Sequence, residues 1–367
     1  MRKHQNFKKR RKGKNHSIFP QQFLISHPDY SKRMEYISEI RSLLASPKDI
    51  VITSHRNPDG DALGASLALY HYLVQSGHQV QILFPSDYPD FFSWLPDVSR
   101  IIDFDNHPDE CRAIAEKAQV AFYLDFNSID RIDKLGEVLD ALKMRKIMID
   151  HHLYPEPAAD FIISDTSASS TCEMIYDFIC ALGDKNAINR TIGDCIYTGI
   201  VTDTGSFKYN TSPKLFCIVS ELVELGVDDN ELQDLITNNL NEKQLRLLGH
   251  CLHNRMEILP EFKTGIISLT KEDYATFDIQ RGDTEGIVNY LLRLREIQFA
   301  AFFMEQPTIV KMSFRSKGEF SVHELARKHF KGGGHKNASG GSSFQSLSAT
   351  MKRFKALLPE YEKELNN

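Results

Sequence analysis

Histidine and aspartate residues concentrate in four short segments of this sequence. The segments are His55-Arg56-Asn57-Pro58-Asp59-Gly60-Asp61, then Asp125, then Asp150-His151-His152, and then Asp203-Thr204-Gly205. Imidazole and carboxylate groups without a thiolate suit Mn²⁺, Mg²⁺ or Fe²⁺ better than a structural zinc ion. Six such groups can hold two ions about 3.5 to 4 Å apart, with one carboxylate shared between them. The pattern therefore predicts a two-ion site of the kind that clamps a phosphoryl group.

Each segment also has a simpler explanation. Asp59 and Asp61 stand where helix N-caps belong, and a single aspartate in such a place is more often a cap than a metal ligand. Asp125 and Asp203 each precede turn residues, and aspartate commonly opens a turn. Four such segments in one region favour the metal interpretation, although periodicity alone does not prove that the side chains meet.

Apolar runs typical of buried strands precede most of these segments and alternate with helical patterns. The strands are expected at residues 49–54, 80–84, 120–124, 146–149 and 161–164, and the helices at 30–46, 61–75, 170–181 and 186–201. This alternation predicts an α/β fold with a mostly parallel sheet that is covered by helices on both faces. Ligands of such sheets bind at the carboxyl ends of the strands, where the four segments fall.

The C-terminal third has a different order of expected helices and strands. Helical patterns at residues 232–240 and 243–258 predict a helical connector, and a smaller α/β unit is expected after it. Its strands are expected at 264–269, 297–304 and 308–314, and its helices at 287–295 and 322–330. We expect a division into residues 1–28, 29–235, 236–260 and 261–367.

A glycine run and one arginine are the candidate anion-binding groups of the C-terminal unit. In Gly332-Gly333-Gly334-His335, successive glycines let backbone N–H groups approach an anion, and the histidine can add a donor or a cation. A flexible loop between a helix and a strand is the alternative. Arg315 ends an expected strand and offers a fork suited to phosphate, or it is an ordinary surface arginine.

Composition excludes several classes of protein. The 367 residues are 41% hydrophobic and 25% charged, which is typical of a folded globular chain and excludes global disorder, collagen and coiled coil. The six cysteines contain no CxxC pair, so a disulfide scaffold or a thiolate zinc site is not expected. No apolar run reaches the roughly 18 residues of a membrane span, and we expect a cytoplasmic protein without a membrane partner.

The first 28 residues form a basic leader. They carry eight Lys or Arg and no acid, so of the formal net charge of −5 the rest of the chain holds −13. Such a segment is too polar to fold alone, and we expect a disordered leader. An arm that contacts RNA through its charge is the alternative, and a mitochondrial address is a third one.

As an ordered set, these motifs resemble those of the DHH/DHHA1 phosphoesterases. The matching motifs are His55-x-x-Pro58-Asp59-x-Asp61-Ala62-x-Gly64, Asp125, Asp150-His151-His152, Asp203-Thr204-Gly205-x-Phe207 and Gly332-Gly333-Gly334-His335-x-x-Ala338-x-Gly340. The resemblance runs from about Tyr30 to the C-terminus and is strongest to the nanoRNase A-like branch. It implies an N-terminal DHH domain, a C-terminal DHHA1 domain and a hydrolase for very short oligoribonucleotides and 3′-phosphoadenosine 5′-phosphate (pAp).

The resemblance also implies roles for individual residues. Two divalent cations, Mn²⁺ or alternatively Mg²⁺, would share Asp125, one with His55 and Asp59 and the other with Asp61, His151 and Asp203. His152 would stay off the metals near the scissile phosphate, and Asp150 would orient the neighbouring histidine. The substrate-binding residues implied are Arg315, Gly333, Gly334 and His335.

Alternatives to this function remain open at the level of sequence. The first is a phosphodiesterase for cyclic or linear dinucleotides, and the second is a non-catalytic RNA-binding protein that has kept the fold. Loss of metal ligands would mark the second, and all six expected ligands are present. The oligomeric state is not determined by any pattern, and a homodimer is one possibility.

Overall fold

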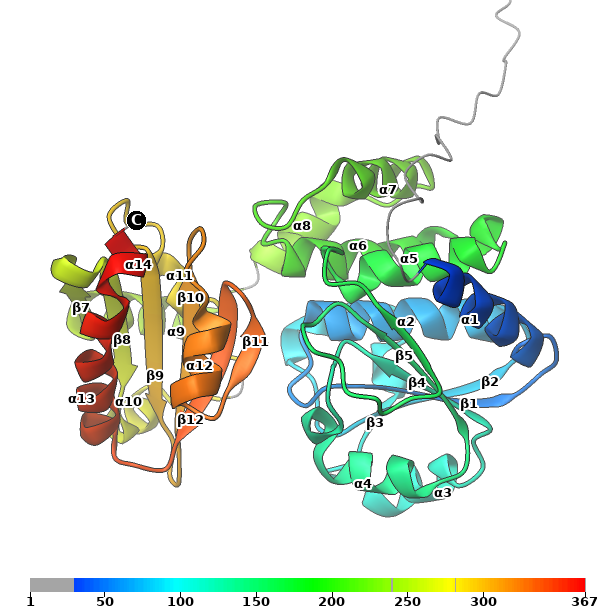
Figure 1. The fold of residues 1–367 in the computed structure, drawn as a ribbon, viewed down its shortest axis with the longest axis horizontal. Helices are drawn as coiled ribbons and strands as arrows, with labels where there is room; N and C mark the ends of the chain where they lie inside the picture. Colours follow the sequence, from blue (N-terminus) through cyan, green and yellow to red (C-terminus); the bar gives the residue numbers. More distant parts are fainter. Residues whose placement is uncertain (1–29, 239, 281, 367) are drawn as a thin grey trace, which may run out of the picture.

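The computed structural model describes residues 30–238, 240–280 and 282–366. The basic leader lies outside these residues. The described chain forms two α/β units, each built on a six-stranded sheet (Figure 1). In this part of the chain, no helix is long and apolar enough to cross a membrane.

The first sheet is parallel throughout and has the strand order β3-β2-β1-β4-β5-β6. Its strands are β1 (Asp49–Ser54), β2 (Gln79–Phe84), β3 (Ile101–Asp103), β4 (Val120–Leu124), β5 (Arg145–Asp150) and β6 (Phe161–Ser164). The chain first builds outward from β1 to β3, and then returns to the other side of β1 and builds outward from β4 to β6. The order therefore reverses between β1 and β4, where a ligand site is expected at the carboxyl ends.

Helices cover both faces of this sheet, as the alternating pattern predicts. The helices of this unit are α1 (Tyr30–Leu43), α2 (Gly60–Gln75), α3 (Pro108–Ala115), α4 (Asp133–Ala141), α5 (Thr171–Ala181), α6 (Arg190–Asp203), α7 (Pro213–Glu224) and α8 (Asp229–Thr237). Figure 1 shows α1, α2, α5 and α6 on one face and α3 and α4 on the other. Along β1, Ile50 and Ile52 belong to the core under the first group, and Val51 belongs to the core under the second.

Close packing of α2, α5 and α6 depends on glycine. A Cβ atom added at Gly199 of α6 would lie 2.2 Å from Cys172 Sγ and 2.6 Å from Asp61 Oδ1. A Cβ at Gly64 of α2 would lie 2.4 Å from the carbonyl oxygen of Cys195. These contacts leave no room for a side chain, so the two glycines bring the helices close enough to place Asp61 beside the start of α5.

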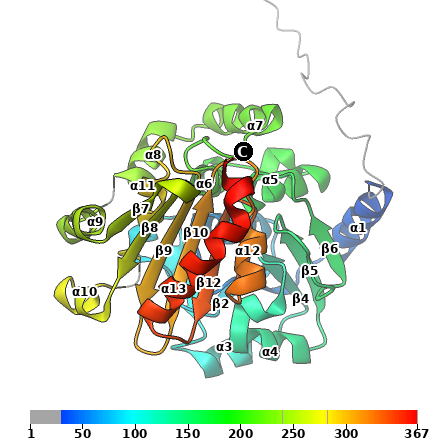
Figure 2. The same ribbon diagram turned by 60° about the vertical axis from the view of Figure 1, so that its left-hand side comes forward.

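The second sheet is mixed and has the strand order β11-β12-β10-β9-β8-β7, in which only β8 and β9 are parallel neighbours. Its strands are β7 (Met256–Leu259), β8 (Thr264–Leu269), β9 (Phe299–Glu305), β10 (Val310–Ser316), β11 (Gly333–His335) and β12 (Ala338–Ser343). Its helices are α9 (Glu242–Asn254), α10 (Lys271–Thr276), α11 (Ile287–Leu291), α12 (Val322–His329), α13 (Leu347–Leu357) and α14 (Glu362–Asn366). Figure 2 shows α12 and α13 lying across one face of this sheet.

One expectation for the C-terminal part is wrong, and so is the loop alternative for the glycine run. The helix expected over residues 243–258 ends at Asn254, and β7 follows because its backbone pairs with β8 from Met256 to Leu259. The glycine run is a strand rather than a loop, since β11 pairs with β12. A Cβ at Gly332 would lie 1.9 Å from the carbonyl oxygen of Gly340, and Gly334 has a φ of 142°. Glycine therefore permits both the close pairing and the backbone conformation of this hairpin.

Candidate metal centre

The six expected metal ligands meet at the carboxyl edge of the first sheet. His55 follows β1, Asp125 follows β4 and His151 follows β5. The helices supply the rest: Asp59 and Asp61 stand at the start of α2, and Asp203 is the last residue of α6. The structure gathers them into two groups, each with ligand atoms within 4.8 Å of one another: His55, Asp59 and Asp125, and Asp61, His151 and Asp203.

The first group is arranged around the Nε2 atom of His55. This atom lies 3.3 Å from Asp125 Oδ2 and 3.8 Å from Asp59 Oδ2. The other ring nitrogen, Nδ1, lies 2.9 Å from the carbonyl oxygen of Arg56, to which it donates. That bond leaves the lone pair on Nε2, which is the arrangement of a metal-ligating histidine.

The second group surrounds the Nε2 atom of His151. It lies 3.4 Å from Asp203 Oδ2, 3.5 Å from Asp125 Oδ1 and 3.7 Å from Asp61 Oδ2. This nitrogen is buried and has no hydrogen-bond partner. A cation placed among these four groups would satisfy the nitrogen and neutralise the carboxylates, so the donor set fits a divalent ion.

Asp125 takes part in both groups through different oxygens. Its Oδ2 faces His55 and its Oδ1 faces His151, and its backbone holds a φ of 62°. Such a left-handed conformation is uncommon for a residue other than glycine, and it directs the carboxylate between the groups. Asp125 therefore has the placement of a bridging ligand.

Burial and neighbouring charges shift the pKa values of three carboxyl groups in this cluster. Burial raises the pKa of Asp61 well above its ordinary value, and the charges of Asp125 and Asp203 raise it further. Burial, opposed by the nearby His151 and reinforced by Asp59, raises the pKa of Asp203 to about 7. Burial acts on Asp125 in the same direction, but His151 and His55 hold the pKa of Asp125 well below its ordinary value. A cluster of this kind is stabilised in its ionised form by bound cations.

Asp59 is both a helix cap and a member of the first group. Its Oδ1 accepts hydrogen bonds from the backbone N–H groups of Asp61 at 3.0 Å and Ala62 at 3.1 Å, which caps α2. Its Oδ2 is the atom that faces His55. The helix-cap explanation of Asp59 is therefore correct for Oδ1, but it does not account for Oδ2, which belongs to the candidate metal centre.

The start of α5 supports two of the ligands. The backbone N–H groups of Thr171 and Cys172 donate to the carboxylate of Asp61 at 2.6 Å and 2.9 Å. The hydroxyl of Thr171 donates to Asp125 Oδ1 at 3.0 Å. Sequence reasoning missed Thr171, although its place directly after the N-cap Ser170 marked it as the first residue of a helix.

Asp150 and His152 form a separate buried pair. Asp150 Oδ1 lies 2.7 Å from His152 Nδ1, and Asp150 is fully buried. The carboxylate thus orients His152, the second histidine after it, whereas the adjacent His151 turns into the ligand group. With Nδ1 held as a donor, the tautomer of His152 is determined by Asp150.

The glycine strand brings His335 onto this centre from the other unit. The ring of His335 stacks on that of His152 with centroids 4.3 Å apart, and lies 4.6 Å from the ring of His151. Burial lowers the pKa of His335 well below its ordinary value, and the charges of His152 and His151 lower it further. Gly333 and Gly334 precede it on β11.

Arg315 is a cation of the second unit that lies near the second ligand group. It lies on β10 opposite Ala338 of β12, and its Nη1 donates to the carbonyl oxygen of Phe314 at 3.0 Å. Its positive charge lowers the pKa of Asp203, and burial lowers the pKa of Arg315 itself. The structure therefore places a partly buried arginine within electrostatic reach of the second ligand group.

Arg131 is a further cation that sequence reasoning missed. Its positive charge opposes the carboxylates that raise the pKa of His55, and it adds to the lowering of the pKa of His335. Arg131 therefore lies within electrostatic reach of a residue of the metal centre and of His335 in the second unit. No motif marked it, because a single arginine in a short 3-10 turn has no distinctive pattern.

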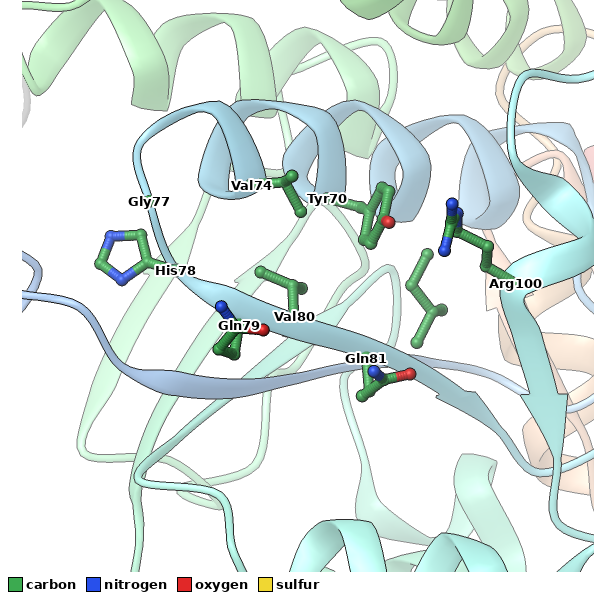
Figure 3. Close-up of a pocket in the computed structure, with 9 residues that line it drawn as sticks. Tyr70, Val74, Gly77, His78, Gln79, Val80, Gln81 and Arg100 are labelled. Atoms are coloured by element: carbon green, nitrogen blue, oxygen red, sulfur yellow. The ribbon is translucent and has the colours of Figure 1, made fainter.

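A hollow elsewhere in the first unit carries none of these groups. It measures about 290 Å³ and is lined by the second half of α2 and the beginning of β2 (Figure 3). Its lining includes Tyr70, His78 and Arg100. Because it adjoins the amino end of β2, it lies away from the carboxyl edge where the ligands meet.

Comparisons with known proteins identify the family of this chain. The chain matches the DHH family, N-terminal domain, over residues 49–200 and the DHHA1 domain over residues 269–364. Two relatives named bifunctional oligoribonuclease and PAP phosphatase NrnA come from Thermus thermophilus and Bacillus subtilis. The first is 28% identical and covers 85% of this chain and 89% of the relative. The second is 29% identical and covers 85% of this chain and 96% of the relative.

Solved structures extend the comparison. The crystal structure of an exopolyphosphatase-related protein from Bacteroides fragilis is 38% identical with a TM-score of 0.87, and it covers 91% of this chain and 98% of its own. RecJ from Thermus thermophilus in complex with Mn²⁺ has a TM-score of 0.52 at 14% identity over 90% of this chain and 54% of its own, which shows a shared fold alone. With both domains matched in order and a relative of this similarity along nearly its whole length, the chain belongs to the DHH/DHHA1 phosphoesterase family.

Proposed function

We propose that this chain is a two-metal phosphodiesterase that hydrolyses very short oligoribonucleotides to nucleoside monophosphates. We propose that it also removes the 3′ phosphate of pAp to give AMP. The observation that carries the proposal is the pair of ligand groups that Asp125 connects through its two oxygens, with His335 of the second unit stacked on the adjacent His152. The names of the two NrnA relatives support the same substrates.

The proposed metal ligands divide as the geometry suggests. His55, Asp59 and Asp125 would hold one cation, and Asp125 would share a second with Asp61, His151 and Asp203. We propose Mn²⁺ for both, with Mg²⁺ as the alternative, because the donors are oxygen and imidazole nitrogen. When bound, two such cations activate water and neutralise charge on phosphoryl oxygens.

The residues around the ligands would orient the substrate. Asp150 holds His152 in one tautomer, so that the imidazole can serve the scissile phosphate or the leaving oxygen. Arg315, His335 and the backbone of Gly333 and Gly334 would grip the end of the nucleotide away from the metals. A grip at a set distance from the metals would favour short chains over long ones.

A turnover panel tests this proposal. The metal-free protein is loaded with Mn²⁺ and given an RNA dinucleotide, pAp, a long RNA, a cyclic dinucleotide, its linear product and polyphosphate. We expect fast hydrolysis of the RNA dinucleotide and pAp, and none after removal of the metal. Absence of any hydrolysis would favour the non-catalytic RNA-binding alternative.

A dinucleotide phosphodiesterase is the second candidate. It is supported by a 23% identical relative named cyclic-di-AMP phosphodiesterase GdpP from Bacillus subtilis, although the match covers 49% of that relative. Faster turnover of the cyclic dinucleotide than of the RNA dinucleotide in the same panel would establish this second candidate instead.

A further inference from the structure

A tyrosine next to the candidate centre contacts the second unit. Tyr154 follows His152 by two residues, and its ring lies against α12. Its centroid is 5.8 Å from that of His323, and Arg327 Cζ lies 5.5 Å from the Tyr154 centroid. Figure 1 shows α12 and β11 on the side of the second unit that faces the first.

The contact of Tyr154 with α12 is better suited to orienting that helix than to packing a core. Tyr154 is 62% exposed, so its ring buries little apolar surface. Its backbone has a φ of 59°, which is uncommon for a residue other than glycine and disfavoured for one with a bulky ring. Arginine against an aromatic face is a specific electrostatic contact, and here it joins residues 173 positions apart in the chain.

His323 connects this contact to the glycine strand. It is 6% exposed, and its Nδ1 lies 2.7 Å from the carbonyl oxygen and 3.2 Å from the backbone nitrogen of Gly334. The next residue, His335, stacks on His152. A closed ring of contacts therefore runs from Tyr154 through His323 and Gly334 to His335 and back to His152.

We propose that Tyr154 is a positioning residue that holds α12, and through His323 the glycine strand, so that His335 stays over His152. The expected effect of Tyr154 on KM rests on the proposed function, whereas its expected effect on the position of the glycine strand β11 does not. Without the ring, the second unit spends less time in the arrangement that grips the substrate. Apparent affinity falls in proportion to the fraction of molecules in the competent arrangement.

The kinetic arm compares Tyr154→Ala with Tyr154→Phe in the Mn²⁺-loaded full chain, with RNA dinucleotide and pAp as substrates. For Tyr154→Ala we expect KM to rise about tenfold, which corresponds to about 1.4 kcal/mol. Bound Mn²⁺ and kcat should be unchanged, since saturating substrate restores the arrangement. Tyr154→Phe keeps the ring and should keep the normal KM; a Phe variant that behaves like Ala would overturn the proposal.

The second arm needs no substrate. Hydrogen exchange of the backbone amides of Gly333, Gly334 and His335 should be faster in Tyr154→Ala than in the unmodified chain. Phe344→Ala is the matched control, because Phe344 is 73% exposed and has Lys331 Nζ 5.7 Å from its ring centroid within the second unit. A general effect on this edge of the sheet would appear in the control as well.

The two arms separate the possible failures. Unchanged exchange in Tyr154→Ala, or an equal increase in Phe344→Ala, overturns the positioning role whatever the enzyme cleaves. If the unmodified protein hydrolyses no short substrate, the proposed function fails, and the exchange result still decides the role of Tyr154. In the exchange assay, the double variant Tyr154→Ala/Arg327→Ala should exchange little faster than either single variant, because each single change already removes the contact between the two side chains. Fully additive increases in exchange rate would overturn the proposal.

Discussion

Replacing Thr171 by valine tests whether the buried support of Asp125 matters for metal binding. Thr171 is fully buried, and valine has nearly the same shape, so packing at the start of α5 is retained. The change removes the hydroxyl that donates to Asp125 Oδ1 at 3.0 Å, and it keeps the backbone N–H that donates to Asp61 at 2.6 Å. One hydrogen bond is therefore lost from the proposed bridging ligand.

The expected loss follows from the type of bond. A hydrogen bond to a charged group contributes about 1.5 to 3 kcal/mol. That range corresponds to Mn²⁺ affinity about 10- to 150-fold weaker, which agrees with the usual effect of removing a partner of a metal ligand. Calorimetric titration of the metal-free protein with Mn²⁺ measures it directly. Thr171→Ser keeps the hydroxyl and should bind Mn²⁺ nearly as the unmodified chain does.

Thr350→Val is the matched control for this experiment. Thr350 is also fully buried, and its hydroxyl donates to Ser343 Oγ at 2.9 Å in the second unit. Loss of this neutral bond should lower the free energy of unfolding by about 1 kcal/mol and leave Mn²⁺ affinity unchanged. Equal Mn²⁺ affinity in Thr171→Val and the unmodified chain would refute the role given to the hydroxyl and weaken the case for Asp125 as a bridge.

Four further outcomes are expected. Asp125→Ala should abolish turnover and lower bound Mn²⁺ in elemental analysis, and near-normal activity with full metal content would remove Asp125 from the site. Arg315→Ala should weaken binding of short substrates by about 1.5 to 3 kcal/mol in equilibrium titrations and leave bound Mn²⁺ in place. A fall in metal content without a loss of substrate affinity would contradict the proposed role of Arg315 in substrate binding. Gly199→Ala should cost about 1 to 3 kcal/mol in thermal unfolding and weaken Mn²⁺ binding, because its Cβ meets Cys172 and Asp61. Deleting residues 1–28 should leave dinucleotide turnover unchanged and reduce salt-sensitive attachment to long RNA in filter binding; loss of dinucleotide turnover would give the leader a part in the site.

Local patterns were sufficient for most of the elements that position the centre. β1, β4 and β6 have the bounds expected from their apolar runs, and α2 begins one residue before its expected start. These elements could be predicted because burial and helical periodicity act over a few residues. The same patterns failed at β7, where helical periodicity continued past the true end of α9, and at β11, which consists largely of glycine and so has no side-chain pattern.

The sequence by itself determined which chemical groups are available and on which strand ends they stand. Parallel strands leave their carboxyl ends at one edge, so His55, Asp125 and His151 were expected near one another. Only the tertiary structure decided which oxygen of Asp125 faces each group, and that Thr171 supports it. The stacking of His335 on His152 was likewise decided by the packing of two units. Spacing along the chain sets where a side chain starts, but its partners depend on contacts between residues far apart in sequence, which no local pattern records.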